Sequence, residues 1–341
     1  MIEVQHLTKR YGPVKAVDDI SFRVEKGEIL GFLGPNGAGK TTTMRILTGY
    51  MPATEGKAIV AGFDVFTQAV DAKLRTGYLP ETPPLYPDMT VREYLTFVAK
   101  IKIGKGLSTA ERNARVDNAM QKTFVKDMAN RHCAKLSKGY RQRVGIAQAL
   151  IHDPEVLILD EPTAGLDPKQ IMETRDLIRA LAGNHTIILS THILPEVSQT
   201  CQRVVIINRG RVVAIDTPAN LTKQVHGGLN LYVQVEAAGA DVPAVLSSVP
   251  GVEKVVLSDQ DGTLGFEIEA EKDRDIRREV AKAIVERGWG LLELRPMRLS
   301  LEETFLQLTM EDRQGPAADA VPPPEPAAAP AESSSEVHLG E

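Results

Sequence analysis

The stretch Gly34-Pro35-Asn36-Gly37-Ala38-Gly39-Lys40-Thr41-Thr42 decides the fold, because it has the spacing G-x-x-x-x-G-K-[ST] of a phosphate-binding loop. The apolar run at 29–33 predicts a buried strand before it, and residues 41–47 predict the first turns of a helix after it. Glycines in such a loop let backbone N–H groups turn inward around a polyphosphate. Lys40 would reach the β- and γ-phosphates, and the Thr41 hydroxyl would hold Mg²⁺. A glycine-rich turn with an incidental lysine would not explain both flanks.

Length and composition favour an ordinary globular protein. The 341 residues suffice for about two domains, and 43% are hydrophobic and 25% charged. No apolar run approaches the roughly 20 residues of a membrane span, and no signal-peptide pattern is present, so we expect a cytoplasmic protein. The net charge of −5 comes from the acidic segment after residue 310, and the remainder is too near neutral for a basic nucleic-acid binder. Cys133 and Cys201 match no metal spacing and should be buried.

Two carboxylates follow a second buried strand. Four apolar residues at 156–159 indicate a strand of a parallel sheet, and Asp160 and Glu161 come at its end. Ligands of α/β folds bind at the carboxyl edge of the sheet. Asp160 would therefore orient Mg²⁺ and its water, and Glu161 would act as the general base. The alternative interpretation is a strand that ends in two solvated acids, and the upstream phosphate loop argues against it.

Three further features are ambiguous when taken alone. Tyr11 is either a platform for an adenine ring or a surface aromatic at the turn 11–13. The segment Leu136-Ser137-Lys138-Gly139-Tyr140 opens a helix and is either an anion site or an ordinary N-cap. His192 follows the buried strand 186–191 and either contacts a γ-phosphate or is a plain loop residue.

The remaining pattern organises residues 1–226 as one α/β domain. Short antiparallel strands are expected at 2–4 and 20–24, with further strands at 57–62, 204–207 and 211–215. A helical insert at about 82–150 contains the capping box Thr90–Glu93 and a helical pattern over 109–130. Residues Ala164–Pro168 form a turn.

In this order and spacing, the motifs resemble the ATP-binding subunit of an ABC transporter over about residues 2–220. The resemblance identifies Gly34–Thr42 as Walker A, Leu136–Tyr140 as the signature, Leu157–Asp160 as Walker B, Glu161 as the catalytic carboxylate, Ala164–Asp167 as the D-loop and His192 as the switch histidine. It also places Tyr11 at the adenine-stacking aromatic. The implied fold is a P-loop NTPase nucleotide-binding domain with a helical subdomain.

Two positions depart from the family pattern. Glu81 stands where the family usually has the Q-loop glutamine, and a carboxylate cannot donate as an amide does, so its contact with Mg²⁺ is open. The signature has Lys138 and Tyr140 in place of the commonest glycine and glutamine, while Ser137 and Gly139 remain. Both departures resemble the branch that serves ABC-2 type permeases. The Gly77–Glu81 stretch and the C-terminal extension resemble the gliding-motility and copper-maturation type subunits.

The resemblance implies a mechanism and partners. Two such domains pair head to tail, as a homodimer or with a second ABC subunit, and each ATP with its Mg²⁺ lies between Walker A of one and the signature of the other. Asp167 belongs to the D-loop. The motor would act through the Q-loop region on a separate ABC-2 type permease, at the cytoplasmic face of the inner membrane, with no nucleic-acid partner.

The C-terminal third has a different pattern. Residues 229–310 predict the order β-α-β-β-α-β of a small ferredoxin-like α+β domain, with a turn at Asp261-Gly262 and a final helix at 299–308. It carries no cluster of catalytic residue types, and either a regulatory or dimerising role or a purely stabilising role is open. The Pro/Ala-rich acidic tail 311–341, including His338, should be disordered.

The leading hypothesis is therefore an ATP-hydrolysing motor of an ABC exporter. A second hypothesis is an ABC-type ATPase that powers a non-transport assembly such as gliding or pilus machinery, which neighbouring permease genes would argue against. A P-loop kinase is the third, but it has no use for Leu136–Arg143 or His192.

Overall fold

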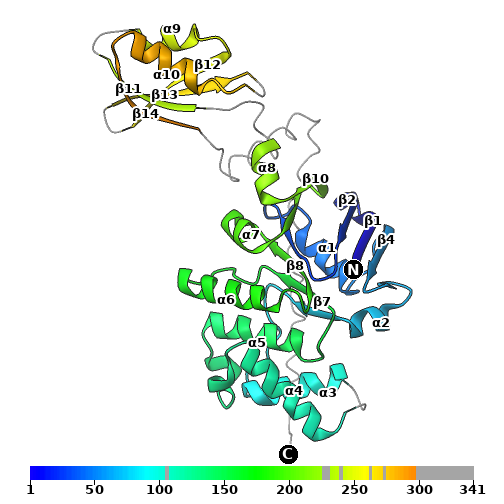
Figure 1. Ribbon diagram of the computed structural model, residues 1–341. Helices are drawn as coiled ribbons and strands as arrows, with labels where there is room; N and C mark the ends of the chain where they lie inside the picture. The colour runs from blue at the N-terminus through cyan, green and yellow to red at the C-terminus, as the bar shows by residue number, and fades with distance from the viewer. Residues whose placement is uncertain (104–106, 225–230, 238–240, 261–262, 272–273, 297–341) are drawn as a thin grey trace, which may run out of the picture.

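The computed structural model describes residues 1–296 except 104–106, 225–230, 238–240, 261–262 and 272–273 (Figure 1). Several predictions lie outside the described residues: the turn at Asp261-Gly262, the final helix at 299–308, and the disordered tail with His338.

A six-stranded sheet forms the centre of the first part of the chain, in the order β10-β9-β3-β8-β7-β6. Its strands are β3 (Ile29–Leu33), β6 (Thr76–Leu79), β7 (Val156–Asp160), β8 (Thr186–Thr191), β9 (Arg203–Asn208) and β10 (Arg211–Asp216). All neighbours are parallel except β9 and β10. Every residue of β3, β7 and β8 is buried, as the continuous apolar runs predicted.

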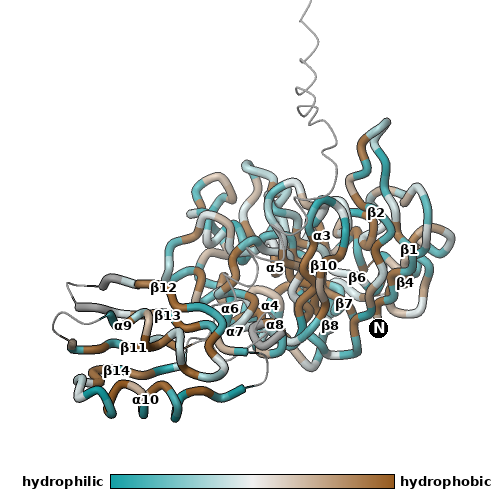
Figure 2. The backbone as a smooth tube through the Cα atoms, turned by 90° about the horizontal axis from the view of Figure 1, so that it is seen from above, coloured by the Kyte–Doolittle hydropathy of each residue, from teal (hydrophilic) through white to brown (hydrophobic). Residues whose placement is uncertain are grey.

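The two faces of this sheet belong to two hydrophobic cores. Along β7, Val156 and Ile158 face one core, and Leu157 and Leu159 face the other, because side chains alternate across a strand. The first core contains α1 (Lys40–Leu47). The second contains α6 (Pro168–Leu181), α7 (Leu194–Thr200) and α8 (Pro218–Gln224), which lie on the opposite side of the sheet in Figure 1. Figure 2 shows hydrophobic segments gathered along the central strands.

A second, antiparallel sheet covers the α1 side, in the order β2-β1-β4-β5. It consists of β1 (Ile2–Tyr11), β2 (Val14–Val24), β4 (Glu55–Val60) and β5 (Phe63–Asp64), followed by α2 (Ala69–Leu74). The strands β1 and β2 are longer than predicted, because irregular register between them breaks the alternation of polar and apolar residues. His6 and Asp19 both have positive φ at these irregularities, and Asp19 Oδ1 pairs with His6 Nδ1 at 2.8 Å.

The helical insert has its own hydrophobic core. It consists of α3 (Val91–Ile103), α4 (Thr109–Lys122), two short 3₁₀ turns (Lys126–Met128 and Cys133–Lys135) and α5 (Lys138–Leu150). The predicted capping box is present, since Thr90 N donates to Glu93 Oε2 and Glu93 N donates to Thr90 Oγ1. The predicted helix over 109–130 is too long. It ends at Lys122, where the Thr123 hydroxyl donates back to the Ala119 carbonyl and Phe124 takes a φ of 55°.

The C-terminal part follows the predicted order. Its elements are β11 (Leu231–Glu236), α9 (Val242–Ser247), β12 (Val252–Gln260), β13 (Thr263–Ala270), α10 (Arg277–Glu286) and β14 (Gly290–Pro296). The antiparallel sheet order β12-β13-β11-β14 is that of a ferredoxin-like fold. Along α10, hydrophobic and hydrophilic residues alternate in Figure 2, and Val280 and Ile284 are buried in the core of this part.

Within the described part of the chain, no helix combines the length and apolar character that crossing a bilayer requires. Both cysteines are buried, as predicted.

Candidate functional site

The phosphate loop runs directly from β3 into α1. Gly39 takes a φ of 104° at the N-cap of α1, a conformation that favours glycine. Gly34 and Gly39 also have no room for a side chain, since a Cβ on either would lie 2.4 Å from a backbone carbonyl oxygen, that of Ile207 or that of Ala16. The Lys40 ammonium donates to the carbonyl oxygens of Gly34 at 2.8 Å and Pro35 at 3.2 Å. The loop thus wraps tightly around a buried cation.

Strand order brings the remaining candidate residues to this loop. The strand β8 lies between β3 and β7, and the three are parallel, so their carboxyl ends meet at one edge of the sheet. Thr41 follows β3, Asp160 and Glu161 stand at the end of β7, and His192 follows β8. The topology alone therefore brings together residues as far apart in sequence as Thr41 and His192.

Asp160 is a fully buried carboxylate with incomplete hydrogen bonding. Its Oδ1 accepts from the hydroxyls of Ser190 and, at 3.4 Å, Thr41. Its buried Oδ2 has no hydrogen-bond partner among the described residues. Burial raises the pKa of the Asp160 carboxyl, and nearby Glu161 and Glu81 add to the rise against the hydrogen bonds from Ser190 and Thr41.

This arrangement fits Mg²⁺ at Thr41 and Asp160. A hydroxyl and an unpaired carboxylate oxygen side by side are hard oxygen donors of the kind that Mg²⁺ prefers. The described residues hold no group of three or more His, Cys, Asp or Glu side chains that could cage a metal. An ion at this place would need phosphate and water oxygens to complete its coordination, as is usual beside a nucleotide.

Glu161 is the meeting point of the site. Its carboxylate lies 3.3 Å from Lys40 Nζ through Oε1 and 2.9 Å from His192 Nδ1 through Oε2. Its backbone leaves the strand direction with a φ of 49°, in the left-handed region that non-glycine residues rarely adopt. The sharp turn directs the side chain across the carboxyl ends of the neighbouring strands. Lys40, Glu161 and His192 therefore form one continuous polar chain.

Ser190 is a site residue that the sequence reasoning missed. It is fully buried, its hydroxyl donates to Asp160 Oδ1, and it accepts from the Glu161 backbone N–H at 3.1 Å. One hydroxyl on β8 thus holds both acidic residues of β7. The signal in the sequence was a polar residue directly after the apolar run 187–189, within the predicted strand 186–191.

We expect Ser190→Ala to lower the free energy of unfolding by about 1–3 kcal/mol, because the buried Asp160 carboxylate loses a donor. Denaturant unfolding at neutral pH measures the change. Ser198→Ala is the matched control, since the Ser198 hydroxyl donates only to a carbonyl of its own helix. Equal effects of the two substitutions would contradict a special contact at Asp160.

A cavity of about 370 Å³ opens over these residues. Its lining includes Asn36, Gly37, Lys40, Thr41, Glu161 and His192. Glu81, two residues after the end of β6, also lines it, so the structure brings the Q-loop position to the phosphate loop. Tyr11 is not among the lining residues. Its ring is 47% exposed at the end of β1, and its hydroxyl donates to Met51 Sδ, so adenine stacking stays a prediction.

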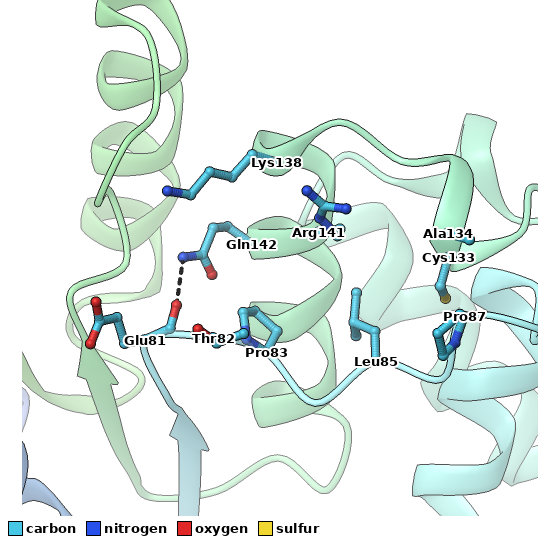
Figure 3. A pocket seen from close by; sticks show the side chains of 10 residues that line it. All are labelled: Glu81, Thr82, Pro83, Leu85, Pro87, Cys133, Ala134, Lys138, Arg141 and Gln142. Atoms are coloured by element: carbon cyan, nitrogen blue, oxygen red, sulfur yellow. Dashed lines mark hydrogen bonds between the residues drawn. The ribbon is translucent and has the colours of Figure 1, made fainter. Parts of the chain in front are cut away.

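A second cavity, of about 310 Å³, lies between the Q-loop position and α5 (Figure 3). The side-chain amide of Gln142 crosses the gap and donates to the Glu81 carbonyl oxygen at 3.2 Å. In Figure 3 the Glu81 carboxylate points away from this amide, and Pro83, Leu85 and Arg141 line the pocket. Glu81 therefore contributes to both cavities, which makes it the link between the phosphate loop and the helical insert.

The signature residues lie at the start of α5, outside the phosphate-loop cavity. Ser137 is the N-cap and accepts from Tyr140 N, as the ordinary capping interpretation also predicts. A Cβ on Gly139 would lie 2.6 Å from Gln170 Oε1 on α6, and one on Gly165 would lie 2.2 Å from Lys138 Nζ. The start of α5 thus packs against the D-loop. Asp167, at the end of that loop, caps α6 by accepting from Gln170 N at 2.9 Å.

The chain is similar to ATP-binding proteins of ABC transporters. A family model described as ABC transporter matches residues 17–164. The daunorubicin resistance ATP-binding protein DrrA3 of Streptomyces coeruleorubidus is 33% identical over 314 residues, which are 92% of this chain and 97% of the relative. The linearmycin resistance ATP-binding protein LnrL of Bacillus subtilis is 30% identical, over 91% and 98% of the two chains. A dimeric bacterial ABC transporter cassette of known structure has a TM-score of 0.59 at 25% identity, over 64% of this chain and 98% of that one.

Proposed function

The chain belongs to the ATP-binding proteins of ABC transporters, a family of ATPases, and from this premise we propose that it drives export through a separate ABC-2 type membrane permease. Its place would be the cytoplasmic face of the inner membrane, bound to that permease. Two relatives that are named for drug resistance favour export as the direction of transport.

The observation that carries the proposal is the convergence of Lys40, Glu161 and His192 beside the phosphate loop. When ATP binds, its β- and γ-phosphates would replace the loop carbonyls and Glu161 as the partners of the Lys40 ammonium. Glu161, released from Lys40 and still held by His192, would accept a proton from the attacking water. Thr41 and Asp160 would hold Mg²⁺, which would neutralise part of the phosphate charge.

We further propose that the site is completed by a second copy of the chain or a paired ABC subunit. Ser137 and Gly139 lie outside the chain's own phosphate-loop cavity. They stand at the N-terminus of α5, which could bind the ATP of a partner. The packing of α5 against the D-loop would then link Asp167 to the same pairing surface. The dimeric relative supports this arrangement.

The pocket beside Glu81 is the proposed contact for the permease. Motion of Glu81 at the phosphate-loop cavity would be passed to Gln142 and to Pro83 and Leu85, which line the second cavity. We also propose the division into a nucleotide-binding domain at 1–226 with its helical subdomain at about 82–150, an accessory domain at 229–310 and a tail at 311–341.

The test is affinity capture of the tagged chain from detergent-solubilised native membranes, followed by mass spectrometry. We expect a multi-span permease of the ABC-2 type among the captured proteins. Capture of motility or pilus proteins without a permease would overturn the transport role in favour of a force-supplying ATPase. Capture from Arg141→Glu membranes is the control, because the charge reversal in the second cavity should weaken recovery of a true permease partner.

A further inference from the structure

Glu196 on α7 is a buried carboxylate that lies outside the proposed ATP contacts. It is 4% exposed, and each of its oxygens accepts from one threonine hydroxyl. Thr163 Oγ1 lies 2.5 Å from Oε1, and Thr191 Oγ1 lies 2.8 Å from Oε2. Both threonines are themselves buried. The two hydroxyls therefore compensate the Glu196 carboxylate for its burial.

The two threonines belong to the two segments that carry the reactive groups. Thr163 comes two residues after Glu161, and Thr191 immediately precedes His192. The Thr191 hydroxyl also accepts from Ile193 N at 3.0 Å. It therefore connects Glu196 to the residues before and after His192. A single carboxylate on α7 therefore joins the turn after β7 to the end of β8.

This link matters because the chain around Glu161 does not follow strand geometry. With a φ of 49°, Glu161 starts a sharp turn away from β7. Its backbone N–H donates to the Ser190 hydroxyl, and side-chain contacts rather than strand pairing fix the turn beyond it. The 2.9 Å contact between Glu161 Oε2 and His192 Nδ1 needs a fixed separation of the two segments. We propose that Glu196 is a positioning residue, which sets this separation through Thr163 and Thr191. The inference rests on the proposed roles of Glu161 and His192.

The experiment compares Thr163→Val with Thr163→Ser in the full-length chain. Valine keeps the shape but removes the hydroxyl, whereas serine keeps it. We expect kcat for ATP hydrolysis to fall about tenfold or more in Thr163→Val, because small misplacements of reacting groups cost that much or more. The Kd for ATP should be unchanged, since the phosphate loop is untouched. Thr163→Ser should recover most of the lost turnover. Ser198→Ala, on the same helix as Glu196, should retain full turnover.

A lower thermal midpoint with wild-type kcat in Thr163→Val would overturn the inference, because Glu196 would then only stabilise the fold. Should Thr163→Val not fold, Glu196→Gln and Glu196→Leu make the same test. Glutamine can accept from one threonine and donate to the other, whereas leucine makes neither link, and equal kcat in both would overturn the inference. Glu161→Gln separates the two proposals: full activity in that variant refutes the proposed role of Glu161 as the base, while its inactivity beside an active Thr163→Val refutes only the positioning role.

Discussion

Glu161→Gln should bind ATP and hydrolyse it about 10²–10⁴ times more slowly than the unaltered chain, because the amide has no basic oxygen to accept the proton of the attacking water. The substitution keeps the size of the side chain and one acceptor for His192 Nδ1, so the buried turn after β7 should persist. Steady-state phosphate release measures turnover, and nucleotide titration measures affinity.

The matched control for this experiment is Glu155→Gln. Glu155 stands just before β7, at the opposite end of the same strand, and forms an exposed pair with Arg75. It should leave turnover unchanged, as surface substitutions usually do. Near-normal turnover in Glu161→Gln would remove Glu161 from the role of base, whatever the control does.

Lys40→Ala should weaken ATP binding itself by about tenfold or more, because one charge-assisted hydrogen bond to a phosphate contributes about 1.5–3 kcal/mol. Lys40 is buried, and its ammonium is the cation that the loop carbonyls and Glu161 share. Removal also leaves the Glu161 carboxylate without its nearest cation, so thermal unfolding must be followed in parallel.

Equilibrium titration with a fluorescent ATP analogue measures the loss in Lys40→Ala. Lys26→Ala, which removes an exposed lysine before β3, is the control for a general loss of positive charge. Unchanged affinity in a folded Lys40→Ala variant would argue against a phosphate-binding role for the loop.

The parts of the site that lie in continuous motifs could be predicted from the sequence. Residues 34–42 carry their own geometry, since the glycines and the following helix are local features. Asp160, Glu161 and His192 follow buried runs, and the ends of parallel strands meet whatever loops connect them. Predicting the approximate location of the site therefore required only the strand order, which the family resemblance supplied.

The contacts that tie the site together could not be predicted in this way. Ser190 and Glu196 act through hydrogen bonds between segments some 30 residues apart, and serine or glutamate at these places has no local signature. The end of α4 was missed for a related reason: the helical pattern continues, but Thr123 and Phe124 break it through their own backbone geometry. For Tyr11 the resemblance alone suggested an adenine contact, and that contact stays a prediction.

The most direct test of the account is the molar mass of Glu161→Gln in solution, measured by light scattering with and without ATP and Mg²⁺. A chain of 37.2 kDa whose slow hydrolysis traps ATP between two copies should double its mass when ATP is added. The same measurement on Glu161→Gln combined with Ser137→Arg should show no such increase, since the bulky cation would block the start of α5. A mass that stays at the monomer value with saturating ATP bound would contradict a site completed by a second copy.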